Sequence, residues 1–158
     1  MTTQSTQSDR DFDEQVRIDA TPEQVWAVLA DPTTMPQASP ELFALTRRRK
    51  GPFRAGETFI GWNRRRAIVW PTISTVTKVS PGQELSWHTK TSGAVWTYTL
   101  TSTEDGTILR ERRTMPSGAP STVRVFADTL LGGMSNHADE LERHVAQTLH
   151  WIKLQVEA

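Results

Sequence analysis

The sequence contains no cysteine, which removes several kinds of chemistry at once. Without thiols the chain has no disulfide, no cysteine nucleophile and no cysteine-ligated zinc or iron–sulfur site. It also has no apolar run near the roughly 20 residues that cross a bilayer, and no basic start followed by an apolar stretch. We therefore expect a cytoplasmic protein.

Net charge is also absent, because 18 Lys and Arg residues balance 18 Asp and Glu residues. Such a chain has no overall field toward nucleic acid or an anionic membrane, so we expect no nucleic-acid partner and no stable membrane insertion. Glycine-rich phosphate loops and the Gly-x-Ser-x-Gly motif are missing as well, and no cofactor is expected. The step from His137 to His144 is too long for a helical metal site, so no metal is expected either.

The length of 158 residues fits one domain with a single core. Residues 1–10 are polar and without apolar periodicity, which predicts a disordered tail, and residues 11–158 are expected to form the domain. No oligomeric state is indicated.

Local patterns predict the first elements. Alternation from Phe12 favours a strand over residues 12–20. The run Thr21-Pro22-Glu23-Gln24 combines a hydroxyl N-cap, proline at the first helical position and glutamine at N3, which predicts a helix ending at Asp31-Pro32. The run Ser39-Pro40-Glu41 repeats this cap and predicts a second short helix through Leu45.

The middle of the chain is rich in β-branched and aromatic residues between turn signals. This pattern predicts six strands joined by short antiparallel connections, near residues 44–50, 57–64, 67–79, 84–91, 94–103 and 107–115. Residues 137–157 carry an apolar stripe of helical period, which predicts a helix about 30 Å long. Val123, Phe126 and Leu130 suggest a helical segment before it, and Gly132-Gly133 a hinge that gates entry.

This order of elements predicts an α+β fold. A curved seven-stranded antiparallel sheet would wrap around the long C-terminal helix, with two short helices after the first strand. Because such a sheet closes imperfectly on a helix, we expect a cavity between them that binds a small hydrophobic molecule.

Several runs carry a family resemblance, namely Ala20-Thr21-Pro22-Glu23-x-Val25-Trp26, Gly56-x-x-Phe59-x-Gly61-x-Asn63, Leu85-x-Trp87, Trp96-x-Tyr98-x-Leu100 and Thr148-Leu149-x-x-Ile152. In this order they resemble the polyketide cyclase/dehydratase-like branch of the START/SRPBCC (Bet v 1-like) superfamily. The resemblance implies a helix-grip fold with a pocket for lipids, sterols, polyketides or other hydrophobic compounds. Members range from carriers to cyclases, so the fold alone does not define the chemistry.

Inward strand parity, the helix stripe, the family resemblance (Trp70 and Val76) and the gate segment (Met134) together select the residues expected to line the pocket: Phe59, Asn63, Trp70, Val76, Leu85, Trp87, Trp96, Tyr98, Leu109, Glu111, Met134, Leu141, Val145 and Leu149. Among them Asn63, Tyr98 and Glu111 are the candidates for hydrogen bonding or acid–base catalysis. The alternative is structural, with the aromatic residues filling a closed core, and Asn63 and Glu111 either satisfied by neighbours or facing outward near a strand end.

Basic residues gather in two clusters, whose candidate contacts are Arg47, Arg48, Arg49, Arg64, Arg65 and Arg66. They favour a solvated strand edge. The alternatives are weak contact with an acidic partner, a lipid headgroup or an anionic ligand, and contact with nucleic acid, whose sites combine cations and aromatic rings as Arg64 to Arg66 and Trp62 do. The leading functional hypothesis is a protein that binds a small hydrophobic ligand. The alternatives are a cyclase, aromatase or dehydratase that folds its substrate, and an interaction module that uses the arginine surface.

Overall fold

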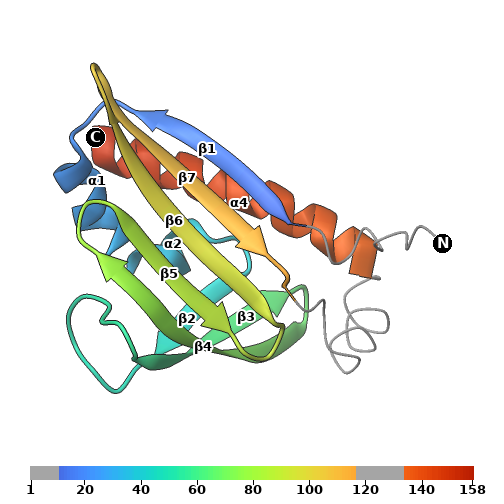
Figure 1. The fold of residues 1–158 in the computed structure, drawn as a ribbon. Helices are drawn as coiled ribbons and strands as arrows, with labels where there is room; N and C mark the ends of the chain where they lie inside the picture. The colour runs from blue at the N-terminus through green and yellow to red at the C-terminus, as the bar shows by residue number, and fades with distance from the viewer. Residues whose placement is uncertain (1–10, 117–133) are drawn as a thin grey trace.

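The computed structural model describes residues 11–116 and 134–158 of the chain (Figure 1). Its elements are, in order, β1 (Phe12–Ile18), α1 (Pro22–Leu29), α2 (Thr34–Ala38), β2 (Leu42–Thr46), β3 (Thr58–Arg65), β4 (Ile68–Ser80), β5 (Glu84–Thr89), β6 (Ala94–Thr103), β7 (Gly106–Thr114) and α4 (Met134–Glu157). The predicted tail, the segment from Val123 to Leu130 and the glycine hinge lie outside the described residues.

The strands form one seven-stranded antiparallel sheet in the order β1-β7-β6-β5-β4-β3-β2. The sheet curls, and α1, α2 and α4 lie on its concave side (Figure 1). The α+β prediction of a curved sheet that grips a long C-terminal helix is therefore confirmed. No helix of the described residues combines the length and the apolar character needed to cross a bilayer.

Helix α1 begins as its sequence predicts. The Thr21 hydroxyl accepts a hydrogen bond from the Gln24 backbone N–H, and the Gln24 side chain accepts one from the Thr21 N–H. This reciprocal pair satisfies two N–H groups that the first turn leaves without helical partners. Val25 and Leu29 are buried, so the helix presents its apolar side to the core.

The prediction of a second helix from Ser39 to Leu45 is wrong. The helix lies earlier, at α2, and residues 42–46 form strand β2. The Ser39 side chain does accept hydrogen bonds from the N–H groups of Glu41 and Leu42, as a cap would. The chain then extends instead of coiling, because Leu42 to Thr46 pair with β3 along the sheet edge.

Side-chain bonds at both ends attach α4 to the sheet. Arg65 of β3 donates two hydrogen bonds of 2.7 Å to the Glu140 carboxylate. Near the other end, the Lys153 ammonium donates to the backbone carbonyl of Arg17 in β1 at 2.9 Å. Between them Leu149 and Ile152 are buried against the inner face of the sheet. The helix is thus fixed across strands that lie far apart in the sheet.

Candidate functional site

The inner face of β7 places a carboxyl group inside the core. Alternate side chains of this strand are buried, namely those of Thr107, Leu109, Glu111 and Arg113. This two-residue period is the one that strand geometry imposes. Glu111 therefore points at the concave side, where α1, α2 and α4 cover the sheet.

Glu111 pairs with Tyr98, its cross-strand neighbour on β6. The Tyr98 hydroxyl donates a hydrogen bond of 2.5 Å to Oε1 of Glu111, and it lies 3.6 Å from the sulfur of Met35 in α2. The side chains are nearly inaccessible, with 2% of Tyr98 and 3% of Glu111 exposed. The other carboxyl oxygen, Oε2, is buried and has no hydrogen-bond partner among the described residues.

Burial controls the ionisation of this pair. Desolvation raises the pKa of Glu111 to about 8, although the hydrogen bond from Tyr98 works in the opposite direction. Burial, reinforced by the neighbouring carboxyl, also raises the pKa of Tyr98 well above its ordinary value. Both groups are therefore neutral at pH 7, and the Glu111 carboxylic acid retains a proton that it can donate.

Aromatic rings surround the pair on the β3 and β5 side. The Trp87 ring centroid lies 5.6 Å from that of Tyr98 and 6.1 Å from that of Phe59. Phe53, from the loop before β3, lies 5.6 Å from Phe59 and 6.2 Å from Trp87. The carboxyl–phenol pair thus stands at the border of an apolar aromatic wall.

A second row of side chains crosses the inner face of the sheet, two residues along β6 and β7 from Tyr98 and Glu111. Phe12, Arg113, Trp96 and Trp87 are successive cross-strand neighbours on β1, β7, β6 and β5. The Arg113 guanidinium lies over the Phe12 ring at 4.8 Å and over the Trp96 ring at 5.8 Å. This cation–π arrangement brings a buried positive charge to the same face as Glu111.

Asn63 is buried on the inner face of β3 but belongs to a different hydrogen-bond group. Its side-chain N–H groups lie within hydrogen-bond reach of the Gly61 and Trp70 carbonyls, at 3.4 Å each, and of the Thr72 hydroxyl at 3.2 Å. All these partners lie within the β3–β4 hairpin. The N–H groups of the amide therefore have their partners within this hairpin, away from Tyr98 and Glu111.

Most of the predicted lining residues meet in one core cluster. Its buried members include Phe59, Val76, Leu85, Trp87, Tyr98, Leu109, Val145 and Leu149, with Trp96 and Leu141 half-buried against them. Trp70 is half-buried next to Asn63. The side chain of Met134 lies outside the described residues.

Sequence reasoning missed three residues of the site: Met35, Phe53 and Arg113. Arg113 shares the inward parity of Glu111, which could have identified it. Met35 lies in the helix that was predicted at the wrong place, and Phe53 lies in an irregular loop without periodicity. For these two the sequence carries no positional signal.

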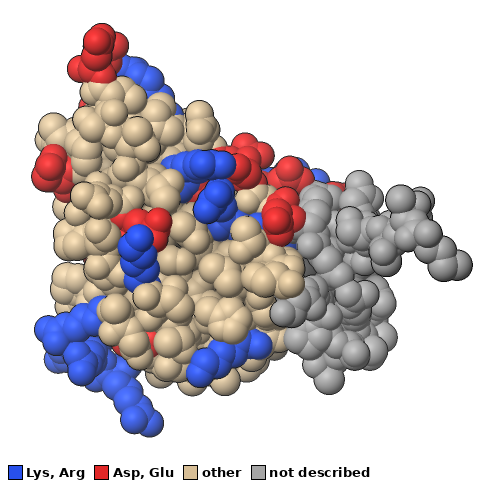
Figure 2. Space-filling model, viewed as in Figure 1, with Lys and Arg blue, Asp and Glu red and all other residues tan. Residues whose placement is uncertain are grey.

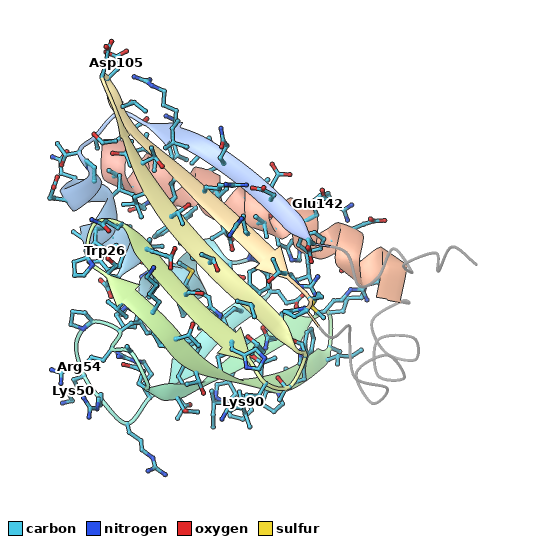
Figure 3. All side chains as sticks on the ribbon, in the orientation of Figure 1. Trp26, Lys50, Arg54, Lys90, Asp105 and Glu142 are labelled. Atoms are coloured by element: carbon cyan, nitrogen blue, oxygen red, sulfur yellow. The ribbon has the colours of Figure 1, made fainter. Side chains whose placement is uncertain are left out.

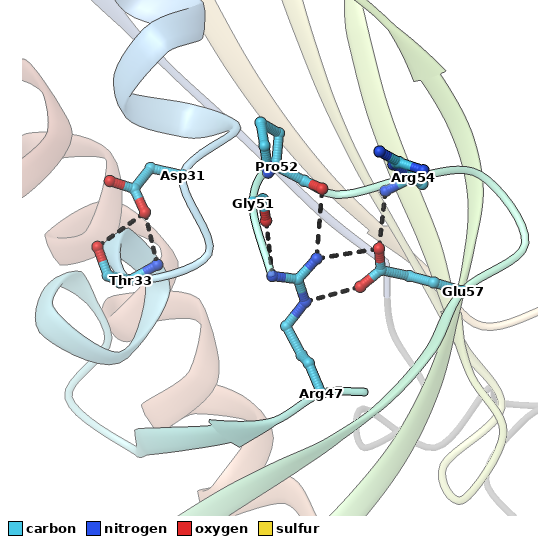
Figure 4. Close-up of polar contacts among 7 residues, drawn as sticks. All are labelled: Asp31, Thr33, Arg47, Gly51, Pro52, Arg54 and Glu57. Carbon is cyan, nitrogen blue, oxygen red and sulfur yellow. Dashed lines mark hydrogen bonds and ion pairs between the residues drawn. The ribbon is translucent and has the colours of Figure 1, made fainter. Parts of the chain in front are cut away.

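Two of the predicted surface arginines are engaged inside the protein. Arg47 donates two hydrogen bonds to the Glu57 carboxylate, at 2.7 and 3.0 Å, and others to the carbonyls of Gly51 and Pro52 (Figure 4). Although burial acts to raise the pKa of Glu57, hydrogen bonds from Arg47 and from the Arg54 N–H lower it overall. Arg65 is held by Glu140, as described above.

A curled antiparallel sheet around a C-terminal helix, with polar groups on its inner face, defines a helix-grip protein. A family model described as "Polyketide cyclase / dehydrase and lipid transport" matches residues 9–146. This match covers most of the chain, and the protein belongs to that family. Membership supports a polyketide-related role in ligand binding or cyclisation, without separating the two.

Solved structures share the fold. The Polyketide_cyc-like protein Cgl2372 from Corynebacterium glutamicum is 24% identical, with a TM-score of 0.63 over 93% of this chain and 92% of that one. The protein TTHA0849 from Thermus thermophilus is 12% identical, with a TM-score of 0.67 over 93% and 97%. The di-domain ARO/CYC StfQ from the steffimycin biosynthetic pathway is 16% identical, with a TM-score of 0.70 over 93% of this chain but 50% of that one. The comparison with curated proteins finds no match.

Proposed function

We propose that this protein binds a small apolar molecule bearing a carbonyl or hydroxyl group, which lies between the sheet and α4 with its oxygen beside Glu111. The observation that carries the proposal is the buried Oε2 atom of Glu111, which has no hydrogen-bond partner among the described residues. An unsatisfied buried polar atom costs about 1–3 kcal/mol, and a hydrogen bond to a ligand would recover that cost.

The chemistry of the pair suits this role. Oε1 of Glu111 accepts the hydrogen bond from Tyr98, so the carboxylic proton can reside on Oε2. A neutral acid in that state donates to a carbonyl or hydroxyl oxygen. The rings of Trp87 and Phe59 offer apolar contact for the body of the same molecule. Lipids and polyketides, the compounds in the description of the family, combine an apolar body with such oxygens.

A second candidate is an enzyme of the cyclase, aromatase or dehydratase type. The observation that favours it is the pKa of about 8 at Glu111, raised by burial. A group whose pKa lies near neutral pH is effective in both giving and taking a proton. Glu111 would then exchange a proton with a substrate oxygen while Tyr98 orients the carboxyl group.

The first test is native mass spectrometry of the protein purified from cells, followed by identification of any released compound. Titration with palmitic acid and with an anthraquinone is then followed by the fluorescence of the six tryptophans, among which Trp87 lies next to Tyr98. We expect Glu111→Leu to weaken binding by about 5- to 100-fold, the value of one hydrogen bond to a buried group. Glu104→Leu is the matched control, because Glu104 is exposed in the turn between β6 and β7, away from the inner face.

The outcomes separate the candidates. Unchanged affinity in a folded Glu111→Leu protein would exclude the carboxyl as a ligand contact and leave the pair with a structural role. Glu111→Gln keeps a donor and an acceptor but cannot exchange a proton. If this variant binds the native compound normally and no longer converts it, the enzyme reading holds. If neither protein converts it, the protein is a carrier.

A further inference from the structure

The basic residues between positions 47 and 66 fall into two groups in the structure. Arg47 and Arg65 are ion-paired with Glu57 and Glu140. The remaining six are exposed and make no ion pair with any described residue: Arg48, Arg49, Lys50, Arg54, Arg64 and Arg66. Glu57 is the one acid between residues 44 and 75, and Arg47 already neutralises it. An uncompensated positive charge therefore remains on this part of the surface.

These cations lie at the two ends of strand β3. Arg48, Arg49, Lys50 and Arg54 belong to the loop before it, and Arg64 and Arg66 to its end and the tight turn into β4. Figure 3 shows Lys50 and Arg54 pointing into solvent, and in Figure 2 blue side chains gather over this loop. An eight-residue strand separates the two groups by about 26 Å.

The strand face between them is apolar and exposed. On β4 the outward side chains are Val69, Pro71 and Ile73, and Val69 and Ile73 are 52% and 41% exposed. Val69 lies opposite Arg64 in the sheet. Exposed branched aliphatic residues on a strand face, with cations at both ends, form a patch that is both apolar and cationic. Such a patch indicates a partner that offers apolar surface as well as negative charge.

We propose that this outer face of β3 and β4, with the six exposed cations beside it, binds the surface of a bilayer that contains anionic phospholipid. The cations contact lipid phosphates and carboxylates, and Val69 and Ile73 enter the interface between headgroups and acyl chains. The contact is peripheral, because no described helix could span the bilayer. It does not depend on the ligand proposed above, since it uses the opposite face of the sheet.

The apolar residues favour a membrane over nucleic acid. A nucleic-acid site combines cations with stacking aromatic rings or with donors aimed at base edges. Here the side chains between the cations are Ile60 and Trp62 on β3 and Val69, Pro71 and Ile73 on β4. Four of the five are aliphatic, and the half-buried Trp62 is a residue that membrane interfaces also favour. A lipid surface also presents anionic headgroups at no fixed spacing. It can therefore contact cations that lie in two separate loops.

The test is co-sedimentation of the whole protein with vesicles of phosphatidylcholine alone or with one third phosphatidylserine. We expect binding to the anionic vesicles only, and its loss as salt rises. The variant R48Q/R54Q/R64Q should bind about 100-fold more weakly, since each cation near such a surface contributes about fivefold. The variant V69T/I73T should bind several-fold more weakly, by about the same factor at low and at intermediate salt, because salt does not screen the apolar part of the contact.

The control variant R17Q/R112Q/R143Q removes the same charge from exposed positions on β1, β7 and α4. It should bind anionic vesicles within about twofold of the wild type. Equal losses in both triple variants would overturn the assignment to this face, and no binding to either vesicle would overturn the proposal itself. Tighter binding to a single-stranded RNA or to polyglutamate than to vesicles, lost in R48Q/R54Q/R64Q, would replace the membrane by that partner. A ligand-binding defect with normal vesicle binding bears on the site at Glu111 alone.

Discussion

Glu111→Gln isolates the effect of pH on a single buried carboxyl group. Glutamine has nearly the same shape as glutamic acid and still accepts a hydrogen bond from Tyr98, but it does not titrate. The difference in unfolding free energy between wild type and variant therefore contains one strongly pH-dependent contribution, which comes from Glu111. Every other titrating group contributes equally to both proteins and cancels.

The sign and size of this difference follow from the pKa of Glu111, which burial raises from 4.5 to about 8 in the folded protein. Between these two values the folded protein holds a proton that the unfolded chain has released. Stability therefore falls as pH rises, by about 1.4 kcal/mol per pH unit. The wild type has no penalty below pH 4.5, and the full penalty, about 5 kcal/mol, is reached above pH 8.

Urea unfolding of both proteins at pH 5, 6, 7 and 7.5 measures this change. Relative to Glu111→Gln, the wild type should lose about 3 kcal/mol across this range. The slopes of free energy against urea should agree between the proteins, which shows that both unfold from the same compact state. A difference that stays constant with pH within about 0.5 kcal/mol would refute the raised pKa, and with it the neutral acid on which both functional candidates rest.

Three further substitutions test the surrounding structure. Tyr98→Phe removes a hydrogen bond that lowers the pKa of Glu111, so the fall in stability with pH should extend to higher pH. Urea unfolding at pH 7 should show a loss of about 1–3 kcal/mol in unfolding free energy. Arg47→Met leaves the buried carboxylate of Glu57 unpaired and should cost about 3 kcal/mol, part of which Glu57→Gln restores in the double variant; additive losses would contradict the pairing. Gly106→Ala would place a Cβ 2.3 Å from the carbonyl oxygen of Ile18, so thermal unfolding should show a melting temperature several degrees lower, and an unchanged one would contradict this close approach.

The architecture was predictable because strand and helix periods act locally. Parity along β6 and β7 identified Tyr98 and Glu111 as inward-facing, and the burial of both is confirmed. The cap at Thr21 predicted the start of α1 for the same reason, since both of its hydrogen bonds lie within four residues. At Ser39 a similar local signal failed, because residues 42–46 pair with residues of β3 that lie 14 to 21 positions away in the sequence.

Contacts between distant segments are what the sequence could not supply. Met35 meets Tyr98 from α2, and Phe53 meets Trp87 from an irregular loop. The partners of the arginines are of the same kind, since Arg65 pairs with Glu140 at a separation of 75 residues. Alternation tells which face a side chain occupies, but not which element covers that face.

Asn63 and Glu111 show why the face that a side chain occupies is not enough to identify a ligand contact. Parity assigns both to the inner face, and in the sequence they are equivalent candidates for a ligand contact. In the structure the N–H groups of Asn63 have partners in their own hairpin, whereas Oε2 of Glu111 is buried with no partner among the described residues. A satisfied polar group gains little from a ligand, and an unsatisfied one gains a full hydrogen bond. The count of hydrogen bonds around each buried group, available only after the strands are aligned, therefore moves the proposed contact from Asn63 to Glu111.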